Sequence, residues 1–317
     1  MIISILVAIA AGAASALMFA SLISGSLIAI VLAYLAPLPL LVAALGWGPL
    51  AAVLGGAVAM AVLGVIAGIT NTVILGVWAA LPAWWLGYLI LLGRPVAAND
   101  PSREGNAAAA TVEWYPMGRV LLWIAATAGL ITIGWLLSLG TDADSIKAAI
   151  RDALTPVLDG RGGRPELGNA AVAAGPAVTV FLTTIMLTLN VWLAGKIAHT
   201  SGRLRRPWPD LKTTMLPPMT LAALSAAIGL CFTGGLLAMI SLVASAAIMT
   251  AYAIVGLATI HTVTRALKSR ALWLSFTYMT LLLFIWPMIV MSFVGLADAV
   301  FGLRKRYLQG KPAVPTS

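Results

Sequence analysis

Two amides and a small set of hydroxyls are the groups through which the long apolar stretches of this chain could bind a ligand. We expect Asn190, Thr183 and Asn71 to contact a substrate, with Asn190 as the leading candidate. Polar side chains are costly to keep in hydrocarbon, so at membrane depth they are candidates for function by default. The competing interpretation is that they only join helices or bond carbonyls of their own helix. The other polar residues of this set are Thr179, Thr184, Thr188, Ser241, Ser245 and His261.

Charged side chains are missing from the centres of these stretches. Proton-driven and sodium-driven pumps depend on such groups, so we expect the chain to be neither. His261 lies one turn before Arg265, and Asp298 lies at the end of the last apolar run, so both are expected near the membrane surface. Cys231, the single cysteine, cannot form an intramolecular disulfide and is expected to serve packing.

Asp142 and Asp144 form the chain's one arrangement typical of metal-dependent transfer chemistry. An Asp-x-Asp motif holds a metal-bound nucleotide sugar in some membrane glycosyltransferases. The alternative is that these aspartates cap a helix N-terminus, which needs no metal. Phosphate-binding, metalloprotease and dinucleotide motifs are absent from the sequence. We therefore expect no enzymatic activity, no metal and no cofactor, with a membrane-embedded transferase as the most distant alternative.

Small residues spaced four apart mark a second kind of candidate site in the first apolar stretch. Ala10 and Ala14 lie on one stripe, and Gly12 and Ala16 lie on the next. Such stripes let two helices approach closely. The stripe could dock a partner protein, or it could pack within the chain's own bundle.

The elements that position these residues must be membrane helices. The first 93 residues contain no charged side chain, and the whole chain is 61% hydrophobic and 9% charged. A helix needs about 20 apolar residues to cross the hydrocarbon core, so we expect an all-α, polytopic fold with eight or nine membrane-spanning helices. The nine candidate spans are Ile2–Ile23, Ser26–Leu45, Pro49–Ile69, Thr72–Leu92, Val120–Leu139, Ala174–Gly195, Thr214–Phe232, Leu236–Thr262 and Leu272–Ala297.

Charge in the loops predicts the orientation and the domain layout. Basic loops favour the cytoplasm, but nine crossings would leave Arg304 to Arg306 outside, so either a short run fails to cross or the tail is an exception. The side of the C-terminus therefore stays open. We expect a four-span module (1–93), a cytoplasmic linker (94–119), a C-terminal module (120–303) and a basic tail (304–317). Residues 142–158 have the apolar periodicity of an amphipathic helix lying on the membrane surface.

Three segments resemble a known family. They are Leu81–Tyr88 (LPAWWLGY), Val255–His261 (VGLATIH) and Val294–Arg306 (VGLADAVFGLRKR). Together and in this order they resemble the YybS-like family of bacterial inner-membrane proteins of unknown function, which is distantly similar to the S components of energy-coupling-factor vitamin transporters. The resemblance covers nearly the whole chain.

This resemblance implies a multi-pass protein of the bacterial inner membrane that captures a small, weakly polar molecule and docks on an ATPase-coupled membrane partner. Ala10 and Ala14 match the small-residue stripe with which S components dock. The chain departs from the S components in its additional spans and in its lack of obvious polar ligands. A non-transporting scaffold or regulatory protein is therefore the alternative, with the basic residues Arg203, Arg205 and Arg206 engaging acidic lipid or a cytoplasmic protein. We expect no nucleic-acid partner.

Overall fold

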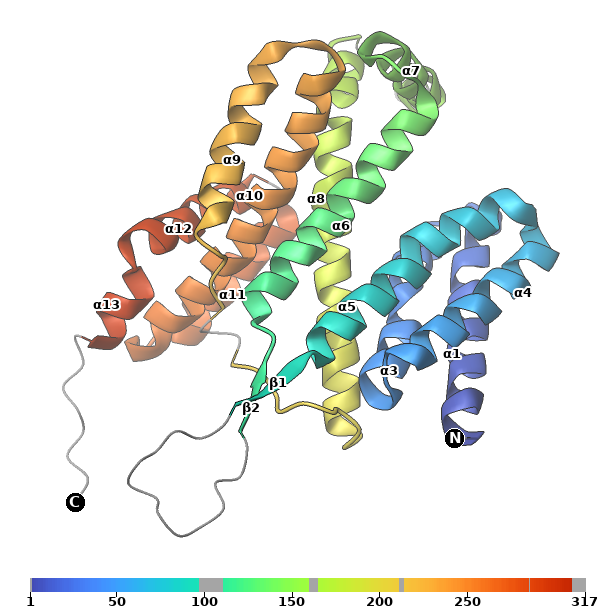
Figure 1. Ribbon diagram of the computed structural model, residues 1–317. Helices are drawn as coiled ribbons and strands as arrows, with labels where there is room; N and C mark the ends of the chain where they lie inside the picture. The colour runs from blue at the N-terminus through green and yellow to red at the C-terminus, as the bar shows by residue number, and fades with distance from the viewer. Residues whose placement is uncertain (1, 97–110, 160–164, 211–213, 285, 310–317) are drawn as a thin grey trace, which may run out of the picture. The chain divides into compact units, whose positions relative to one another are not determined.

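The computed structural model describes residues 2–96, 111–159, 165–210, 214–284 and 286–309 (Figure 1). Helix makes up 86% of the structure, so the predicted all-α class is confirmed. Figure 1 shows that the described chain is almost entirely helical, with the short strands β1 and β2 lying side by side. The first helices are α1 (Ile2–Ala20), α2 (Leu27–Leu35), α3 (Pro37–Trp47), α4 (Pro49–Leu75) and α5 (Leu81–Leu91). Then come β1 (Gly93–Val96), β2 (Thr111–Trp114), α6 (Met117–Leu139), α7 (Ala143–Asp159), α8 (Pro165–Thr200), α9 (Met219–Leu230), α10 (Gly235–Val263), α11 (Arg270–Leu283), α12 (Pro287–Phe301) and α13 (Leu303–Gln309).

The protein is a multi-pass membrane protein. Among the described residues, six helical stretches are long and apolar enough to cross a bilayer. Large apolar side chains such as Leu27 and Val65 are exposed, as contact with lipid requires. The predicted count of eight or nine spans is not confirmed.

Two breaks explain why the count of spans is difficult to predict. The stretch Pro49–Leu91 is 43 residues long, which as one helix would be about 65 Å, twice the hydrocarbon thickness. It leaves helical geometry at Gly68 (φ 82°, ψ 174°), two residues before the expected break at Thr70. The expected span Leu272–Ala297 is wrong as a single helix, because it divides into α11 and α12, of 14 and 15 residues.

The chain forms two compact units. Unit 1 comprises Met1–Val120 and Met186–Pro209, and unit 2 comprises Leu121–Ile185 and Asp210–Ser317. Two of the divisions fall inside α6 and α8, and the third falls in the loop after α8. The predicted four-span module lies within unit 1, together with the C-terminal part of α8 and the basic loop that follows it.

Glycine allows the closest helix contact in unit 1. A Cβ at Gly12 of α1 would collide with the carbonyl oxygen of Gly55 in α4. The buried core nearby includes Phe19, Leu63 and Leu75. Gly12 thus serves packing within the bundle. Of the two interpretations of the small-residue stripes, packing within the chain's own bundle applies to the stripe of Gly12.

Unit 2 is built around α10 and α12, which also meet through glycines. A Cβ at Gly256 would collide with the carbonyl oxygen of Met291, and a Cβ at Gly295 with that of Tyr252. The two glycines occupy the same place in a repeated Val-Gly-Leu-Ala sequence, at 255–258 and 294–297. Two of the three segments that carry the family resemblance therefore pack against each other.

The predicted amphipathic helix is confirmed as α7, but two isoleucines of its apolar face are covered by protein. Ile146 and Ile150 are buried, and α7 contacts α10. Lys147 and Arg151 are exposed on the other side. The expectation that this face lies in the membrane surface is therefore wrong for these two isoleucines.

The ends of the expected linker are ordered as an antiparallel ribbon. β1 pairs with β2 so that Gly93 lies opposite Trp114 and Arg94 opposite Glu113. These strands were not predicted from the sequence, because they have no hydrophobic periodicity of their own. Residues 97–110 of the expected linker lie outside the described residues.

Candidate functional site

Asn190 lies in the part of α8 that belongs to unit 1, and its side chain is completely buried. Its Nδ2 donates to the carbonyl oxygens of Tyr34 and Met186, both at 2.8 Å. The second bond stays within α8, whereas the first reaches α2. Since an amide nitrogen carries two N–H groups, both donors are used, and the direction of the carboxamide is determined.

The Tyr34 carbonyl lies beside a break in the helix. The helix is interrupted between α2 and α3, where Pro37 has no N–H to donate to the carbonyl of Ala33, four residues earlier. Ser15 of α1 donates to the carbonyl oxygen of Ala36 at 2.8 Å, at the same interruption. Asn190 and Ser15 therefore both donate to backbone carbonyls beside a break within the bundle, which agrees with the helix-joining interpretation of these polar residues.

The oxygen of the Asn190 side chain has a different environment. Oδ1 is buried and has no hydrogen-bond partner among the described residues. An unsatisfied buried acceptor costs about 1–3 kcal/mol. Exchanging the oxygen and nitrogen would not help, because two carbonyl oxygens already surround the nitrogen. Oδ1 is therefore an oriented, buried acceptor that the described part of the protein leaves without a donor.

The surroundings of the Tyr34 carbonyl are apolar and aromatic. Ala33 and Ala36 belong to the buried core cluster of unit 1, and Trp78 packs against that cluster. The rings of Tyr34 and Trp78 lie 5.4 Å apart between centroids. A molecule that satisfied Asn190 here would meet mostly hydrocarbon and ring surface.

The two other predicted substrate-binding residues make bonds within their own helices. Thr183 is buried in unit 2 and donates to the carbonyl oxygen of Thr179 at 2.9 Å. Asn71 is exposed in unit 1 and donates to the carbonyl oxygen of Ala67 at 2.8 Å, beside the break at Gly68. In the described part of the chain, neither residue hydrogen-bonds to Asn190.

Other buried hydroxyls join helices in places that sequence reasoning missed. In unit 2, Thr220 of α9 and Tyr252 of α10 share a hydrogen bond of 2.6 Å. Ser292 of α12 donates to the carbonyl oxygen of Met249 in α10 at 2.9 Å. No spacing rule separates these hydroxyls from others in apolar runs. The sequence therefore offers no signal for them beyond residue type.

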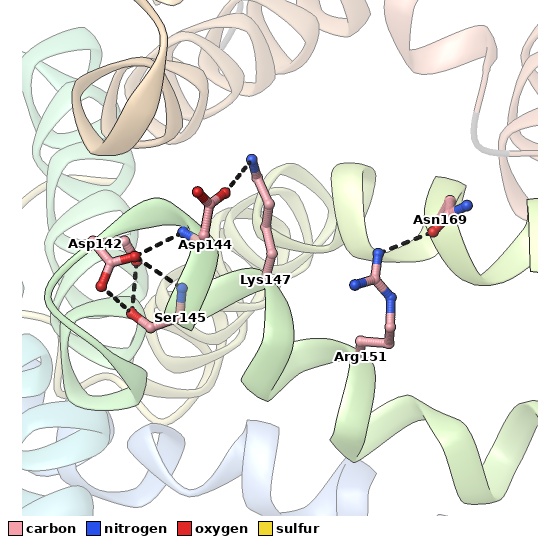
Figure 2. A network of polar contacts seen from close by, with 6 residues as sticks. All are labelled: Asp142, Asp144, Ser145, Lys147, Arg151 and Asn169. Atoms are coloured by element: carbon pink, nitrogen blue, oxygen red, sulfur yellow. Dashed lines mark hydrogen bonds and ion pairs between the residues drawn. The ribbon is translucent and has the colours of Figure 1, made fainter.

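Asp142 caps the N-terminus of α7 (Figure 2). Its Oδ1 accepts hydrogen bonds of 3.0 Å from the backbone N–H groups of Asp144 and Ser145, and the Ser145 hydroxyl donates to Oδ2 at 2.7 Å. These bonds, mainly those from Ser145, lower the pKa of the Asp142 carboxyl. Asp144 pairs with Lys147 at 3.4 Å. The helix-capping interpretation is therefore confirmed for Asp142.

Among the described residues, no three His, Cys, Asp or Glu side chains are placed to hold a metal ion. Beyond the cap, Arg151 of α7 donates to Oδ1 of Asn169 in α8 at 3.0 Å, as Figure 2 shows. The polar groups near the start of α7 thus hold that helix in place.

The predicted docking residues lie away from the buried side of α1. Ala10 is exposed and Ala14 is half-buried, whereas Gly12 and Ala16 are buried. The two stripes therefore differ in their surroundings. The stripe of Ala10 is open to lipid or to a partner.

The basic loop after α8 uses one of its three arginines internally. Arg206 donates from Nη1 to the carbonyl oxygen of Ile90 at 2.9 Å, and its guanidinium lies 5.5 Å from the ring centroid of Trp114. Burial lowers the pKa of this guanidinium. Arg203 and Arg205 are exposed. Arg206 thus anchors the loop, and the other two arginines face outward.

The sequence predicted that Asp298 faces the headgroups, but its side chain lies in a buried ion pair. Its Oδ2 lies 2.7 Å from both Nε and Nη2 of Arg304, and its Oδ1 accepts the backbone N–H of Arg304 at 2.8 Å. Gly302 permits this arrangement by turning the chain in the left-handed region (φ 62°). The last of the family-like segments therefore forms a helix end closed by an ion pair.

Two remaining candidates have local partners. His261 Nε2 lies 2.7 Å from the hydroxyl of Tyr278, across α10 and α11. Cys231 is a free thiol that donates to the carbonyl oxygen of Ala227 at 3.3 Å and lies 3.8 Å from the Ser245 hydroxyl. Both contacts fit a packing role.

Comparison of the chain with protein-family models, with curated proteins and with solved structures found no match.

Proposed function

We propose that this membrane protein captures a small, weakly polar molecule within the bilayer, in the manner of the S components that its sequence resembles. In this proposal the chain has no enzymatic activity and lies in a bacterial inner membrane. The unsatisfied Oδ1 of Asn190 is the observation that carries the proposal.

The chemistry of the site defines the class of ligand. The molecule needs one N–H or O–H group to satisfy Asn190 Oδ1 and an apolar body to replace hydrocarbon contacts near Tyr34 and Trp78. A charged ligand does not fit, because burying an unpaired charge costs far more than one hydrogen bond returns. A small, largely apolar molecule with one donor group is the class that fits.

Native mass spectrometry of the gently extracted, full-length protein tests this proposal. We expect a bound small molecule whose composition includes an N–H or O–H donor. Asn190→Leu should remove it, because the variant has no acceptor. A bound molecule without any donor group, or one that Asn190→Leu retains, would refute the proposal.

Ser15→Ala is the matched control for Asn190→Leu. Ser15 bonds the carbonyl of Ala36 at the same helix interruption, so its loss weakens the bundle by about 0.5–1.5 kcal/mol without touching the acceptor. We expect Ser15→Ala to retain the ligand. Equal loss of ligand from both variants would mean that binding depends only on the integrity of the bundle.

The partner in this proposal is an ATPase-coupled membrane protein that docks on the stripe of Ala10 and Ala14. The exposure of Ala10 supports the choice of this stripe over that of Gly12. Replacing both alanines by leucine should abolish co-purification of the ATPase and its coupling subunit while leaving the fold intact. Ala57 and Ala61 of α4 are also exposed and spaced four apart, so their replacement by leucine is the control that should leave the complex unchanged.

A non-transporting scaffold or regulatory protein is the alternative. The bonding of Thr183, Thr220 and Ser292 within the protein favours it, since these polar groups already serve helix packing. Empty protein that co-purifies with a cytoplasmic partner, and without an ATPase, would favour the scaffold over capture.

A further inference from the structure

The C-terminal end of α8 and the loop after it place several cations beside tryptophan rings in unit 1. Lys196 Nζ lies 5.5 Å from the ring centroid of Trp208. The guanidinium of Arg203 lies 5.6 Å from the ring centroid of Trp47 at the end of α3. These two cation–ring pairs involve α3, α8 and the loop after α8. The basic surface therefore depends on the fold of unit 1 and not on one helix alone.

The backbone of this loop is well defined by its hydrogen bonds. Gly202 turns the chain in the left-handed region (φ 66°), and the N–H groups of Arg203 and Leu204 return to the carbonyl oxygen of Ala198 at 2.8 and 2.9 Å. The half-buried Arg206 then ties the loop to the carbonyl oxygen of Ile90. The outward-facing cations are therefore held in place by the residues on both sides of them.

Arg205 completes the cluster because Gly48 leaves room for it. A Cβ at Gly48 would lie 2.9 Å from Arg205 Nη1. Among the described residues, Lys196, Arg203 and Arg205 have no carboxylate within 4.0 Å. Their charges are thus not neutralised by the described part of the protein.

Tryptophan rings and basic side chains have a common place in membrane proteins. Tryptophan concentrates at the level of the lipid headgroups, and lysine and arginine beside a membrane helix attract anionic lipids. Arginine also binds phosphate oxygens in a forked geometry. We propose that Lys196, Arg203 and Arg205, with Trp47 and Trp208 beside them, bind the headgroup of an anionic phospholipid.

Native mass spectrometry of the full-length protein in mild detergent tests the lipid site. The probes are phosphatidylglycerol and phosphatidylcholine with identical acyl chains. We expect the unaltered protein to retain phosphatidylglycerol preferentially. Each basic residue near an anionic surface contributes about fivefold, so Arg203→Gln with Arg205→Gln should lower the preference by about 5- to 25-fold.

Two further variants separate this site from general charge. Lys305→Gln with Arg306→Gln removes the same charge from exposed residues of α13 and should leave the preference unchanged. Arg203→Lys with Arg205→Lys keeps both charges and should retain most of it. All variants should unfold at the same temperature as the unaltered protein, since the replaced side chains are exposed.

Several results would overturn the lipid site. One is equal retention of the two lipids by the unaltered protein, and another is a preference that survives Arg203→Gln with Arg205→Gln. An equal loss in the α13 variant would show that total charge, not this surface, attracts the lipid. Binding of a cytoplasmic protein through these arginines without any lipid preference would assign the surface to a protein partner instead.

Discussion

Replacing Arg304 by leucine should be among the most destabilising single changes in unit 2. The side chains of Asp298 and Arg304 are only 2% and 7% exposed, and two guanidinium nitrogens lie 2.7 Å from the same carboxylate oxygen. Arg304→Leu leaves that carboxylate with the backbone N–H of residue 304 as its remaining partner from this pair. Removing one member of a buried ion pair typically costs about 3–5 kcal/mol.

An exposed ion pair of the same length supplies the control. Nη2 of Arg94 also lies 2.7 Å from an oxygen of Glu113, but these side chains are 78% and 56% exposed. Exposed pairs contribute about 0–1 kcal/mol, so Arg94→Leu should have little effect. The free energy of unfolding can be measured for both variants by circular dichroism in mixed micelles with increasing dodecyl sulfate.

The double variant Asp298→Leu with Arg304→Leu tests the reasoning further. It removes both charges, so no uncompensated carboxylate remains, and its loss of stability should be smaller than the sum of the two single losses. A cost for Arg304→Leu no greater than that for Arg94→Leu would refute the view that burial makes this pair important.

Three further predictions concern packing, pH and the basic loop. Gly256→Ala should destabilise the protein by about 1–3 kcal/mol, because the new Cβ collides with the backbone of Met291; Gly134→Ala, whose Cβ meets nothing within 4 Å, should stabilise it by about 0.5–1 kcal/mol in the same unfolding assay. The lowered pKa of Asp142 means that its contribution to folding is present above the ordinary value of 3.8 and is lost as pH falls through the lowered value; Asp142→Asn should reduce the acid-dependent loss of helicity measured below roughly pH 4. Arg206→Gln should increase proteolysis of the loop after α8 at least severalfold, because one side-chain anchor to the carbonyl of α5 is lost; an unchanged cleavage rate would contradict the anchoring role.

The features that could be predicted from the sequence are those determined by local composition. The absence of charge before Arg94 required membrane helices, and the four-residue periodicity around Ile146 and Ile150 identified α7. An N-terminal cap by Asp142 or Asp144 followed from residue type and position, and the structure assigns it to Asp142, whose bonds reach only two and three residues along the chain.

The features that could not be predicted depend on contacts between distant segments. The strand pairing of Arg94 with Glu113 joins residues 19 apart and has no periodic signal. Asp298 looked like a headgroup contact because its partner is separated from it by the turn at Gly302. The recurrence of Val-Gly-Leu-Ala in α10 and α12 was a usable signal, since paired glycines in apolar helices indicate close packing.

The candidate site could likewise be predicted only in part. Residue type singled out Asn190, and the structure shows that its amide nitrogen is occupied by Tyr34 and Met186 while its oxygen is not. The different environments of the nitrogen and the oxygen could not be predicted from the sequence, because they depend on which backbone carbonyls the folded bundle places beside the Asn190 side chain.

Native mass spectrometry of the gently extracted protein, with Asn190→Leu and Ser15→Ala measured beside it, tests ligand capture most directly. We predict a bound small molecule with an N–H or O–H donor in the unaltered protein and in Ser15→Ala, and its loss from Asn190→Leu. Empty protein in all three samples, or a ligand retained by Asn190→Leu, would contradict the proposal that Asn190 Oδ1 binds a captured molecule.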